Sequence, residues 1–296
     1  MESSPLTEIG LPIALAIIMV GIGLTLTVGD FRRELKTPKG VVVGSIGQLL
    51  LLPALGFVII SVLDLDPAIA VGLIIVAACP GGTTSNLISF LGRANVALSI
   101  VLTVVASIVT IVSLPLFTDL AIDLQASVQA DGTSLEVPVL RTVLTLVAVV
   151  LVPVLVGMAV RARAPHRAAS AEKAVAIFGA VLLVALIIGI ALAVDDVVGL
   201  IRQAGPAVLL LNIGGIVIGA VLGRFAGLNW TDRLTLAIEL GVKNSTLGIL
   251  LGGLLGDLTW AVPSAVYGLL MYVSAGVLVL IGRRHDDVAP PVPTHT

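Results

Sequence analysis

Glu239 and Lys243 are the two charged residues predicted to lie deep inside a long apolar stretch of this chain. They stand four residues apart in the segment ELGVKNS, whose last two residues are Asn244 and Ser245. A charge inside a membrane is costly unless it is paired or hydrated, so such residues usually mark an ion or substrate path. The alternative interpretation is a structural ion pair one helical turn apart, which is compatible with a functional role.

Polar side chains also gather in two earlier segments. The segment CPGGTTSN carries Thr83, Thr84, Ser85 and Asn86, and a later apolar run carries a stripe of hydroxyls at helical spacing. Their hydroxyl and amide oxygens, like the Glu239 carboxylate, are hard ligands that suit a hard cation such as sodium. The alternative is that hydroxyls in membrane helices bond their own backbone or allow close packing. The stripe consists of Ser99, Thr103, Ser107 and Thr110.

Composition places these residues in a membrane. The chain has 296 residues, of which 58% are hydrophobic and 11% charged, whereas soluble domains carry roughly 25% charged residues. A net charge of -2 gives no basic patch for nucleic acid, and no phosphate-binding GxxxxGK[ST] loop is present for ATP-driven pumping. Cys79 is the only cysteine, which excludes an intramolecular disulfide.

The apolar runs predict an all-α polytopic protein with about nine spans. Thirteen Lys and Arg residues fall on one side of these spans and two, Arg141 and Arg202, on the other. This bias predicts that the N-terminus lies outside and the C-terminus in the cytoplasm, and we expect the membrane to be the plasma membrane. The N-terminal segment lacks a positive flank, so the first run is predicted to be a mature span. The predicted spans are 8–29, 40–63, 67–91, 95–119, 137–161, 172–194, 205–227, 232–255 and 259–282.

Two of these spans carry helix breakers or polar clusters in their middle. Pro80, Gly81 and Gly82 interrupt span 67–91, and Gly241 stands beside the polar cluster of span 232–255. Interrupted helices in corresponding positions of two halves indicate the binding site of a secondary transporter. We therefore predict one transmembrane domain, 1–285, with inverted repeats over about 8–119 and 137–282, followed by a disordered tail, 286–296. Gln48 and Asn212, each a lone amide in the span before a break, support the repeat, although either amide could serve only helix packing.

Three motifs in order, CPGGTTSN (79–86), GRANVALSIVLT (92–103) and ELGVKNS (239–245), resemble those of the bile acid sodium symporter family, prokaryotic type. The resemblance implies a core domain, in which two broken helices cross, and a panel domain made of the first, fifth and sixth spans. It further implies uptake of an organic anion together with sodium, the coupling ion, and no organic cofactor.

Matching the motifs residue by residue implies three groups of site residues. The first sodium site would consist of Ser85, Asn86, Ser99, Thr103 and Glu239. The second cation site would use Gln48, Glu239, the backbone at Leu240 and Val242, and position 243. The substrate would meet Thr83, Asn244 and Ser245.

The chain departs from the family pattern at two places. Sodium-coupled relatives have Gln where this chain has Lys243, so we hypothesise that its ammonium replaces the second sodium or carries a proton. Relatives that bind bile acids have a His-Asn pair where this chain has Met271 and Tyr272. This difference favours a small carboxylate, such as pyruvate, pantoate or another keto or hydroxy acid, over a bile acid.

Other classes of function remain as alternatives. A cation/proton antiporter, or a proton-coupled anion transporter on the same fold, would also use crossed broken helices and a buried lysine. An intramembrane enzyme is disfavoured because the sequence has no HExxH or GxSxG motif and no His within a span. A channel is disfavoured because one pair of broken helices indicates an occluded site. Saturable uptake with counterflow would separate a transporter from a channel.

Overall fold

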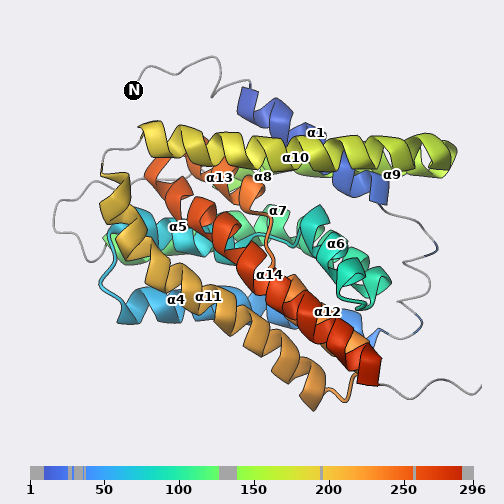
Figure 1. Ribbon diagram of the computed structural model, residues 1–296. Coiled ribbons are helices and arrows are strands. Elements are labelled where there is room, and N and C mark those ends of the chain that lie inside the picture. Colours follow the sequence, from blue (N-terminus) through green and yellow to red (C-terminus); the bar gives the residue numbers. More distant parts are fainter. Residues whose placement is uncertain are drawn as a thin grey trace, which may run out of the picture.

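The protein is built from helices that pack into one bundle (Figure 1). The computed structural model describes residues 10–25, 29, 36, 38–126, 139–193, 196–255 and 258–288. Their α-helices are α1 (Leu11–Thr25), α3 (Lys39–Ile46), α4 (Leu52–Val62), α5 (Pro67–Ala78), α6 (Thr83–Leu91), α7 (Val96–Ala126), α8 (Val139–Leu146), α9 (Val152–Arg163), α10 (Pro165–Ala193), α11 (Val197–Phe225), α12 (Trp230–Gly241), α13 (Ser245–Leu255) and α14 (Val262–Val288).

The number of membrane spans agrees in part with the prediction. Within the described ranges, seven helical runs are long and apolar enough to cross a membrane, and α5 with α6 forms an eighth, broken run. The first predicted span, 8–29, contains α1, which is shorter than the other candidates. The chain is therefore a multi-pass membrane protein, whereas the total of nine spans stays a prediction.

Several predicted boundaries differ from the helices. The helix α7 continues to Ala126, beyond the predicted end of its span at 119. The rest of the predicted outer loop, 127–138, lies outside the described residues. At the other end of the chain α14 runs to Val288, so it includes the first residues of the predicted tail. Residues 289–296 lie outside the described part.

Both predicted interruptions are present. The helix α5 ends at Ala78 and α6 begins at Thr83, and the two helices are bent by 60°. Pro80 has no backbone N–H and disfavours helical geometry at the preceding residue, and Cys79 accordingly has extended backbone angles. The second break separates α12, which ends at Gly241, from α13, which begins at Ser245. There Val242 is extended, although the sequence from 230 to 255 contains no proline.

Two further prolines widen a helix without breaking it. A π-helical turn, Gly47–Leu51, joins α3 to α4, and another, Val147–Leu151, joins α8 to α9. In each case a proline, Pro53 or Pro153, follows two residues after the turn. Because proline cannot donate to the carbonyl four residues earlier, the widened turn accommodates the missing hydrogen bond. Gln48 lies in the first of these turns.

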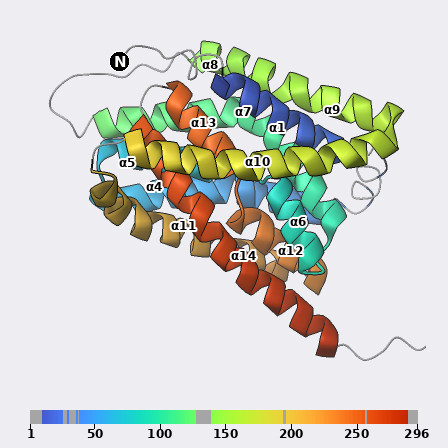
Figure 2. The ribbon, with the colours of Figure 1, turned by 45° about the horizontal axis from the view of Figure 1, so that its top comes forward.

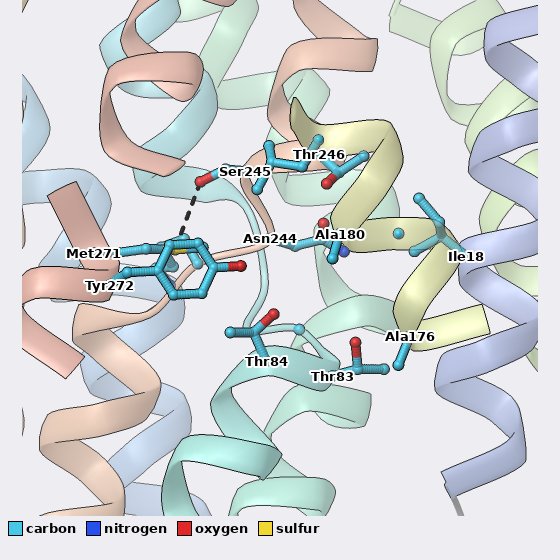
Figure 3. A pocket seen from close by; sticks show the side chains of 14 residues that line it. Ile18, Thr83, Thr84, Ala176, Ala180, Asn244, Ser245, Thr246, Met271 and Tyr272 are labelled. Carbon is cyan, nitrogen blue, oxygen red and sulfur yellow. Dashed lines mark hydrogen bonds between the residues drawn. The ribbon is translucent and has the colours of Figure 1, made fainter. Parts of the chain in front are cut away.

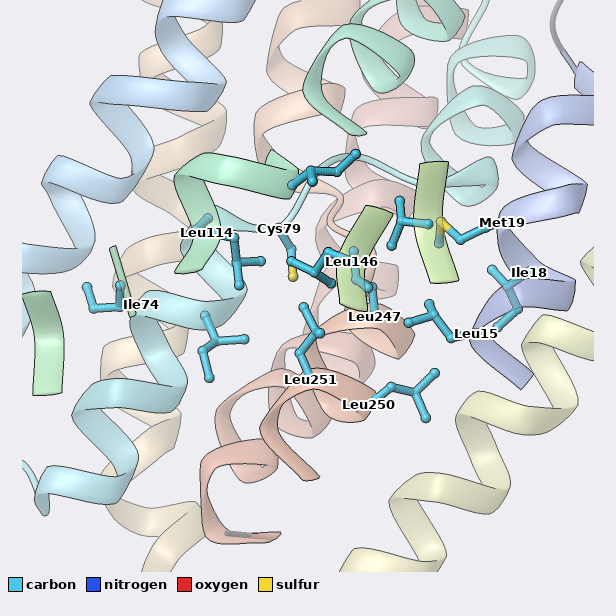
Figure 4. Packing of buried hydrophobic residues seen from close by; sticks show 14 of the residues in the cluster. Leu15, Ile18, Met19, Ile74, Cys79, Leu114, Leu146, Leu247, Leu250 and Leu251 are labelled. Carbon is cyan, nitrogen blue, oxygen red and sulfur yellow. The ribbon is translucent and has the colours of Figure 1, made fainter. Parts of the chain in front are cut away.

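The helices α1, α9 and α10 lie together on one side of the bundle, and α1 packs against both partners (Figures 1 and 2). At the crossing of α1 and α9, a Cβ on Gly23 would lie 2.9 Å from the Cα of Gly157, so side chains there would separate the helices. The buried side chains of α1, including Leu15 and Met19, form an apolar cluster with residues of α5, α7 and α13 (Figure 4). This cluster joins the α1 side of the bundle to the broken helices.

The second broken span is enclosed by protein along most of its length. Every residue from 234 to 252 is buried. Close packing with α11 contributes, because a Cβ on Gly215 would lie 2.6 Å from the carbonyl oxygen of Leu240. Glycine permits this approach of the two backbones, as is common where membrane helices pack tightly. Among the seven described helical runs that are long enough to cross a membrane, this one is the least apolar.

Candidate binding site at the crossing of the broken helices

The two breaks touch each other through their backbones. The N–H of Asn244 donates to the carbonyl oxygen of Pro80 at 2.9 Å. Gly82 lies beside the same contact, since a Cβ on it would come 3.6 Å from the Cβ of Asn244. The helices α6 and α13 both begin directly after their breaks, so their N-terminal ends start near one point of the bundle. Unpaired amide groups at helix N-termini favour anions.

The carboxylate of Glu239 is the centre of a buried polar cluster. Its Oε1 accepts a hydrogen bond from Ser99 Oγ at 2.5 Å, and its Oε2 accepts one from Thr103 Oγ1 at 3.1 Å. All three side chains are buried. Ser99 and Thr103 stand four residues apart on α7, so both hydroxyls reach the carboxylate from one helical face.

The broken helix α6 completes this cluster. Ser99 Oγ also lies 2.9 Å from Asn86 Oδ1, and Ser85 Oγ lies 3.5 Å from Thr103 Oγ1. Ser85 Oγ donates to the carbonyl oxygen of Gly82 at 2.8 Å. The structure thus brings together all five residues predicted for the first sodium site. Of their side-chain atoms, Asn86 Nδ2 has no hydrogen-bond partner within the described residues.

Gly81 leaves room for the Glu239 carboxylate. A Cβ on Gly81 would lie 2.5 Å from Glu239 Oε2 and 3.1 Å from the hydroxyl oxygens of Ser85 and Thr103. A side chain at this position would therefore displace the carboxylate or the hydroxyls. The glycine belongs to the motif that breaks the first helix, so one residue serves both the break and the cluster.

Two other hydroxyls of the predicted stripe do not join the cluster. Ser107 Oγ donates to the carbonyl oxygen of Thr103 at 2.7 Å, and Thr110 Oγ1 donates to that of Ser107 at 3.3 Å. These are bonds within α7, as the alternative interpretation of membrane hydroxyls expects. The stripe therefore divides into a part that meets Glu239 and a part that does not.

The residues predicted for a second cation site are all buried: Gln48, Leu240, Val242 and Lys243. Neither polar atom of the Gln48 amide, nor the Lys243 Nζ, has a hydrogen-bond partner among the described residues. The helix α12 ends at Gly241, two residues before Lys243. Helical spacing does not extend beyond the break, so the expected separation of Glu239 and Lys243 by one helical turn is wrong, whereas the pairing of their charges stays a prediction.

The carbonyl oxygen of Gly241, at the end of α12, accepts two hydrogen bonds. Asn212 Nδ2 of α11 donates at 2.8 Å, and Tyr267 Oη of α14 donates at 3.0 Å. Both donors are buried, and they tie the end of the broken helix to two neighbouring helices. Sequence reasoning singled out Asn212 but missed Tyr267. The available signal was that Tyr267 is one of only two tyrosines, placed within an apolar span.

A small cavity of about 60 Å³ lies between the breaks and α10 (Figure 3). All three predicted substrate residues line it: Thr83, Asn244 and Ser245. Met271 and Tyr272 of α14 also line it, and Ser245 Oγ contacts the Met271 Sδ at 3.8 Å. Sequence reasoning missed the opposite wall, which consists of Ile18 of α1 and Ala176, Gly179, Ala180 and Leu183 of α10. Its small residues at helical spacing were the only signal, and helix packing produces the same pattern.

The sequence of the chain matches a known protein family. A model of the sodium bile acid symporter family matches residues 12–199, which is more than half of the chain. The chain belongs to this family. The matched range contains the first break and the α7 hydroxyls, whereas Glu239 and the second break lie beyond it.

Curated relatives match nearly the whole chain. A probable sodium/metabolite cotransporter of Arabidopsis thaliana chloroplasts, BASS1, is 32% identical over 92% of this chain and 66% of its own length. An uncharacterized sodium-dependent transporter of Bacillus subtilis, YocS, is 31% identical over 90% of this chain and 80% of its own. The human ileal sodium/bile acid cotransporter is 29% identical over 80% and 67%. The chain thus spans just under two thirds of the chloroplast relative.

Proposed function

We propose that this chain is a secondary active transporter that couples sodium entry to the uptake of a small organic anion. The observation that carries the proposal is the buried Glu239 carboxylate with the Ser99 and Thr103 hydroxyls bonded to it. A carboxylate surrounded by hydroxyl and amide oxygens is a donor set that suits sodium. The names of the relatives, which include sodium/metabolite and sodium/bile acid cotransporters, support the same coupling ion.

Sodium would bind at the Glu239 cluster, with Ser85, Asn86, Ser99 and Thr103 as the other ligands. In the structure the hydroxyls of Ser99 and Thr103 donate to the carboxylate. When a cation binds, the oxygen lone pairs of the same groups would coordinate it. The site is formed by α6, α7 and α12, so its integrity depends on the crossing of the two broken helices.

We further propose one sodium ion in each cycle. Lys243 is buried, its Nζ has no hydrogen-bond partner in the described structure, and it stands in the segment that would supply the second site. Two cations that share one carboxylate repel strongly where the dielectric constant is low. The Lys243 ammonium would therefore take the place of a second sodium near Gln48 and the backbone at Leu240 and Val242.

The organic anion would bind in the cavity at the crossing. Thr83 begins α6 and Ser245 begins α13, and both residues line this cavity with Asn244 between them. Two helix N-termini that face one cavity favour a carboxylate there. Since the cavity is far smaller than the roughly 300–1,000 Å³ of pockets for drug-sized ligands, a compact carboxylate fits this conformation better than a bile acid.

Transport would proceed by movement of a core domain against a panel domain. The cavity has residues of the broken helices on one side and residues of α1 and α10 on the other, which supports a boundary between two such domains. In this proposal the panel contains α1, α8, α9 and α10, the two domains arise from inverted repeats, and the crossing moves as one piece. For the proposed location in the plasma membrane, the excess of Lys and Arg on one side supports an orientation with the C-terminus in the cytoplasm.

Purified protein tests the coupling directly. We expect small carboxylates to raise the melting temperature in sodium and to raise it much less in potassium, because ion and substrate stabilise the same state. Glu239→Gln should abolish the sodium dependence, whereas Asp123→Asn, the same exchange at an exposed position of α7, should preserve it. Equal shifts in sodium and potassium for the unmodified protein would contradict the proposal.

A second candidate function is cation/proton antiport, and the observation that favours it is the buried Lys243 without a hydrogen-bond partner. A buried lysine can exchange its proton, so sodium binding at Glu239 could expel it. In proteoliposomes, an antiporter would move protons when a sodium gradient is applied without any organic anion. A pH-sensitive dye inside the vesicles that responds only after an organic acid is added would exclude antiport.

A further inference from the structure

The cavity at the crossing has two chemically different walls. Hydroxyl and amide groups of Thr83, Thr84, Asn244, Ser245 and Thr246 line the side of the broken helices. The side of α1 and α10 presents only aliphatic groups and a glycine. In Figure 3, Ala176 and Ala180 lie on the α10 ribbon and Ile18 lies to their right, on the α1 ribbon. A ligand that satisfies both walls must be polar at one end and apolar at the other.

The charge of the lining limits the ligand to one negative charge. Among the described residues around the cavity, Lys243 is the one charged residue, and it belongs to the polar side. The apolar wall offers no donor to a second carboxylate, which would lose its hydration without compensation. A ligand with charges at both ends therefore does not fit, whereas a monocarboxylate with a short aliphatic tail does.

Gly179 sits where this tail would end. A Cβ on Gly179 would have a single neighbour within 4 Å, Ile18 Cγ1 at 3.9 Å, so the space above this residue is open to the cavity. The flanking Ala176 and Ala180 carry only a methyl group each. The small size of Gly179 is not required by a close helix contact, since among the described residues no backbone atom of another helix lies within 4 Å of the position of its Cβ.

We propose that Gly179, with Ala176 and Ala180, sets the tail length of a compact monocarboxylate substrate. This inference rests on the proposed function and adds the substrate class and the residues that determine specificity. With room for roughly four water-sized groups, the cavity fills after a few carbon atoms. One methylene more or less in an apolar pocket changes discrimination by roughly tenfold or more, so a small side chain at this wall alters the preferred length.

A series of straight-chain 2-oxo acids of increasing length tests the proposal, with 2-oxoglutarate as the doubly charged comparison. The readout is inhibition of sodium-dependent uptake of the best labelled acid into proteoliposomes. Gly179→Val should shift the preference to shorter acids, with roughly a tenfold loss for the longest acid that the unmodified protein accepts. Ala180→Gly should shift the preference in the opposite direction. In every variant, the dicarboxylate should inhibit uptake of the labelled acid only weakly.

The matched control is Gly189→Val on the same helix. A Cβ on Gly189 would meet no described atom within 4 Å, so the position is as open as Gly179, but the residue is exposed and does not line the cavity. It should leave the length preference unchanged. An unchanged preference in both Gly179→Val and Ala180→Gly, or competition by the dicarboxylate equal to that of the monocarboxylates, would overturn this inference alone. Failure of the unmodified protein to take up any of the acids with sodium would overturn the proposed function as well.

Discussion

The backbone of Gly81 lies so close to the Glu239 carboxylate that a Cβ on Gly81 would come within 2.5 Å of Oε2. The residue that helps to break the first helix is thus in contact with the acid carried by the second. A carboxylate in this position is held by hydroxyl groups on one side and by bare backbone on the other.

Gly81→Ala should therefore weaken sodium binding by roughly tenfold or more, because hydrogen bonds to a charged group are worth about 1.5–3 kcal/mol and the displaced carboxylate would lose them. A titration with sodium, monitored through the melting temperature of the protein, measures this effect. The adjacent Gly82→Ala is the matched control, since its Cβ would make only an ordinary contact, 3.6 Å from Asn244. If both variants bind sodium alike, the proximity of Gly81 to Glu239 has no functional meaning.

The hydroxyls of α7 provide a second test. Thr103→Val removes a hydroxyl that donates to Glu239 while it keeps the shape of the side chain, and it should lower sodium affinity by roughly tenfold. Thr110→Val removes an equally buried hydroxyl that bonds only the carbonyl of Ser107 within the same helix. We expect the sodium affinity of that variant to stay within about twofold of that of the unmodified protein, because no hydrogen bond to Glu239 is lost. Equal losses in both variants would show that burial, and not the contact with Glu239, matters.

The stoichiometry of sodium should depend on Lys243. Lys243→Gln removes a fixed positive charge from the second cation site and should raise the number of sodium ions per cycle from one to two, or abolish transport if the charge is essential. The sodium dependence of uptake, expressed as a Hill coefficient, measures the change. Lys39→Gln, at an exposed position at the start of α3, should not alter it. Two sodium ions already in the unmodified protein would refute the replacement hypothesis.

The two donors to the Gly241 carbonyl should be coupled energetically. Tyr267→Phe or Asn212→Leu alone leaves the other donor in place, so each should cost about 0.6–1.5 kcal/mol of unfolding free energy. The double variant leaves a buried carbonyl without a donor and should cost more than the sum of the two. Unfolding in nanodiscs measures the cycle, with Tyr272→Phe, 44% exposed, as the hydroxyl control. Additive costs would mean that the two donors act independently.

Much of the site could be predicted from the sequence because its polar residues and helix breakers stand together in short motifs. Pro80 with its two glycines predicts the first break, and the polar cluster after Glu239 predicts the second. Ser99 and Thr103 reach the same carboxylate because their spacing matches one helical turn. Backbone rules and helical periodicity were sufficient for the breaks and for the shared face of Ser99 and Thr103, whereas the meeting of these hydroxyls with Glu239 was implied only by the resemblance to the family.

The features that sequence reasoning missed depend on contacts between distant helices. Tyr267 reaches Gly241 from another helix, and no local pattern in either segment indicates that pairing. The α10 wall of the cavity was missed because Ala176 and Gly179 have no chemistry of their own and matter only through the space they leave. The spacing of Glu239 and Lys243 was predicted wrongly because helical periodicity was extended across a break that lies between them.

The complete enclosure of the second broken span, where every residue from 234 to 252 is buried, also bears on how the protein is made. A segment is released into lipid by the insertion machinery when its own apolarity suffices, and this one is the least apolar of the seven described helical runs and carries Glu239 and Lys243 in its buried part. The helices that bury it are largely α11 and α14, which lie on either side of it in the chain. We therefore expect stable insertion of the second broken span to depend on α14, which follows it in the chain, so a nascent chain that stops before α14 should be poorly integrated into the membrane.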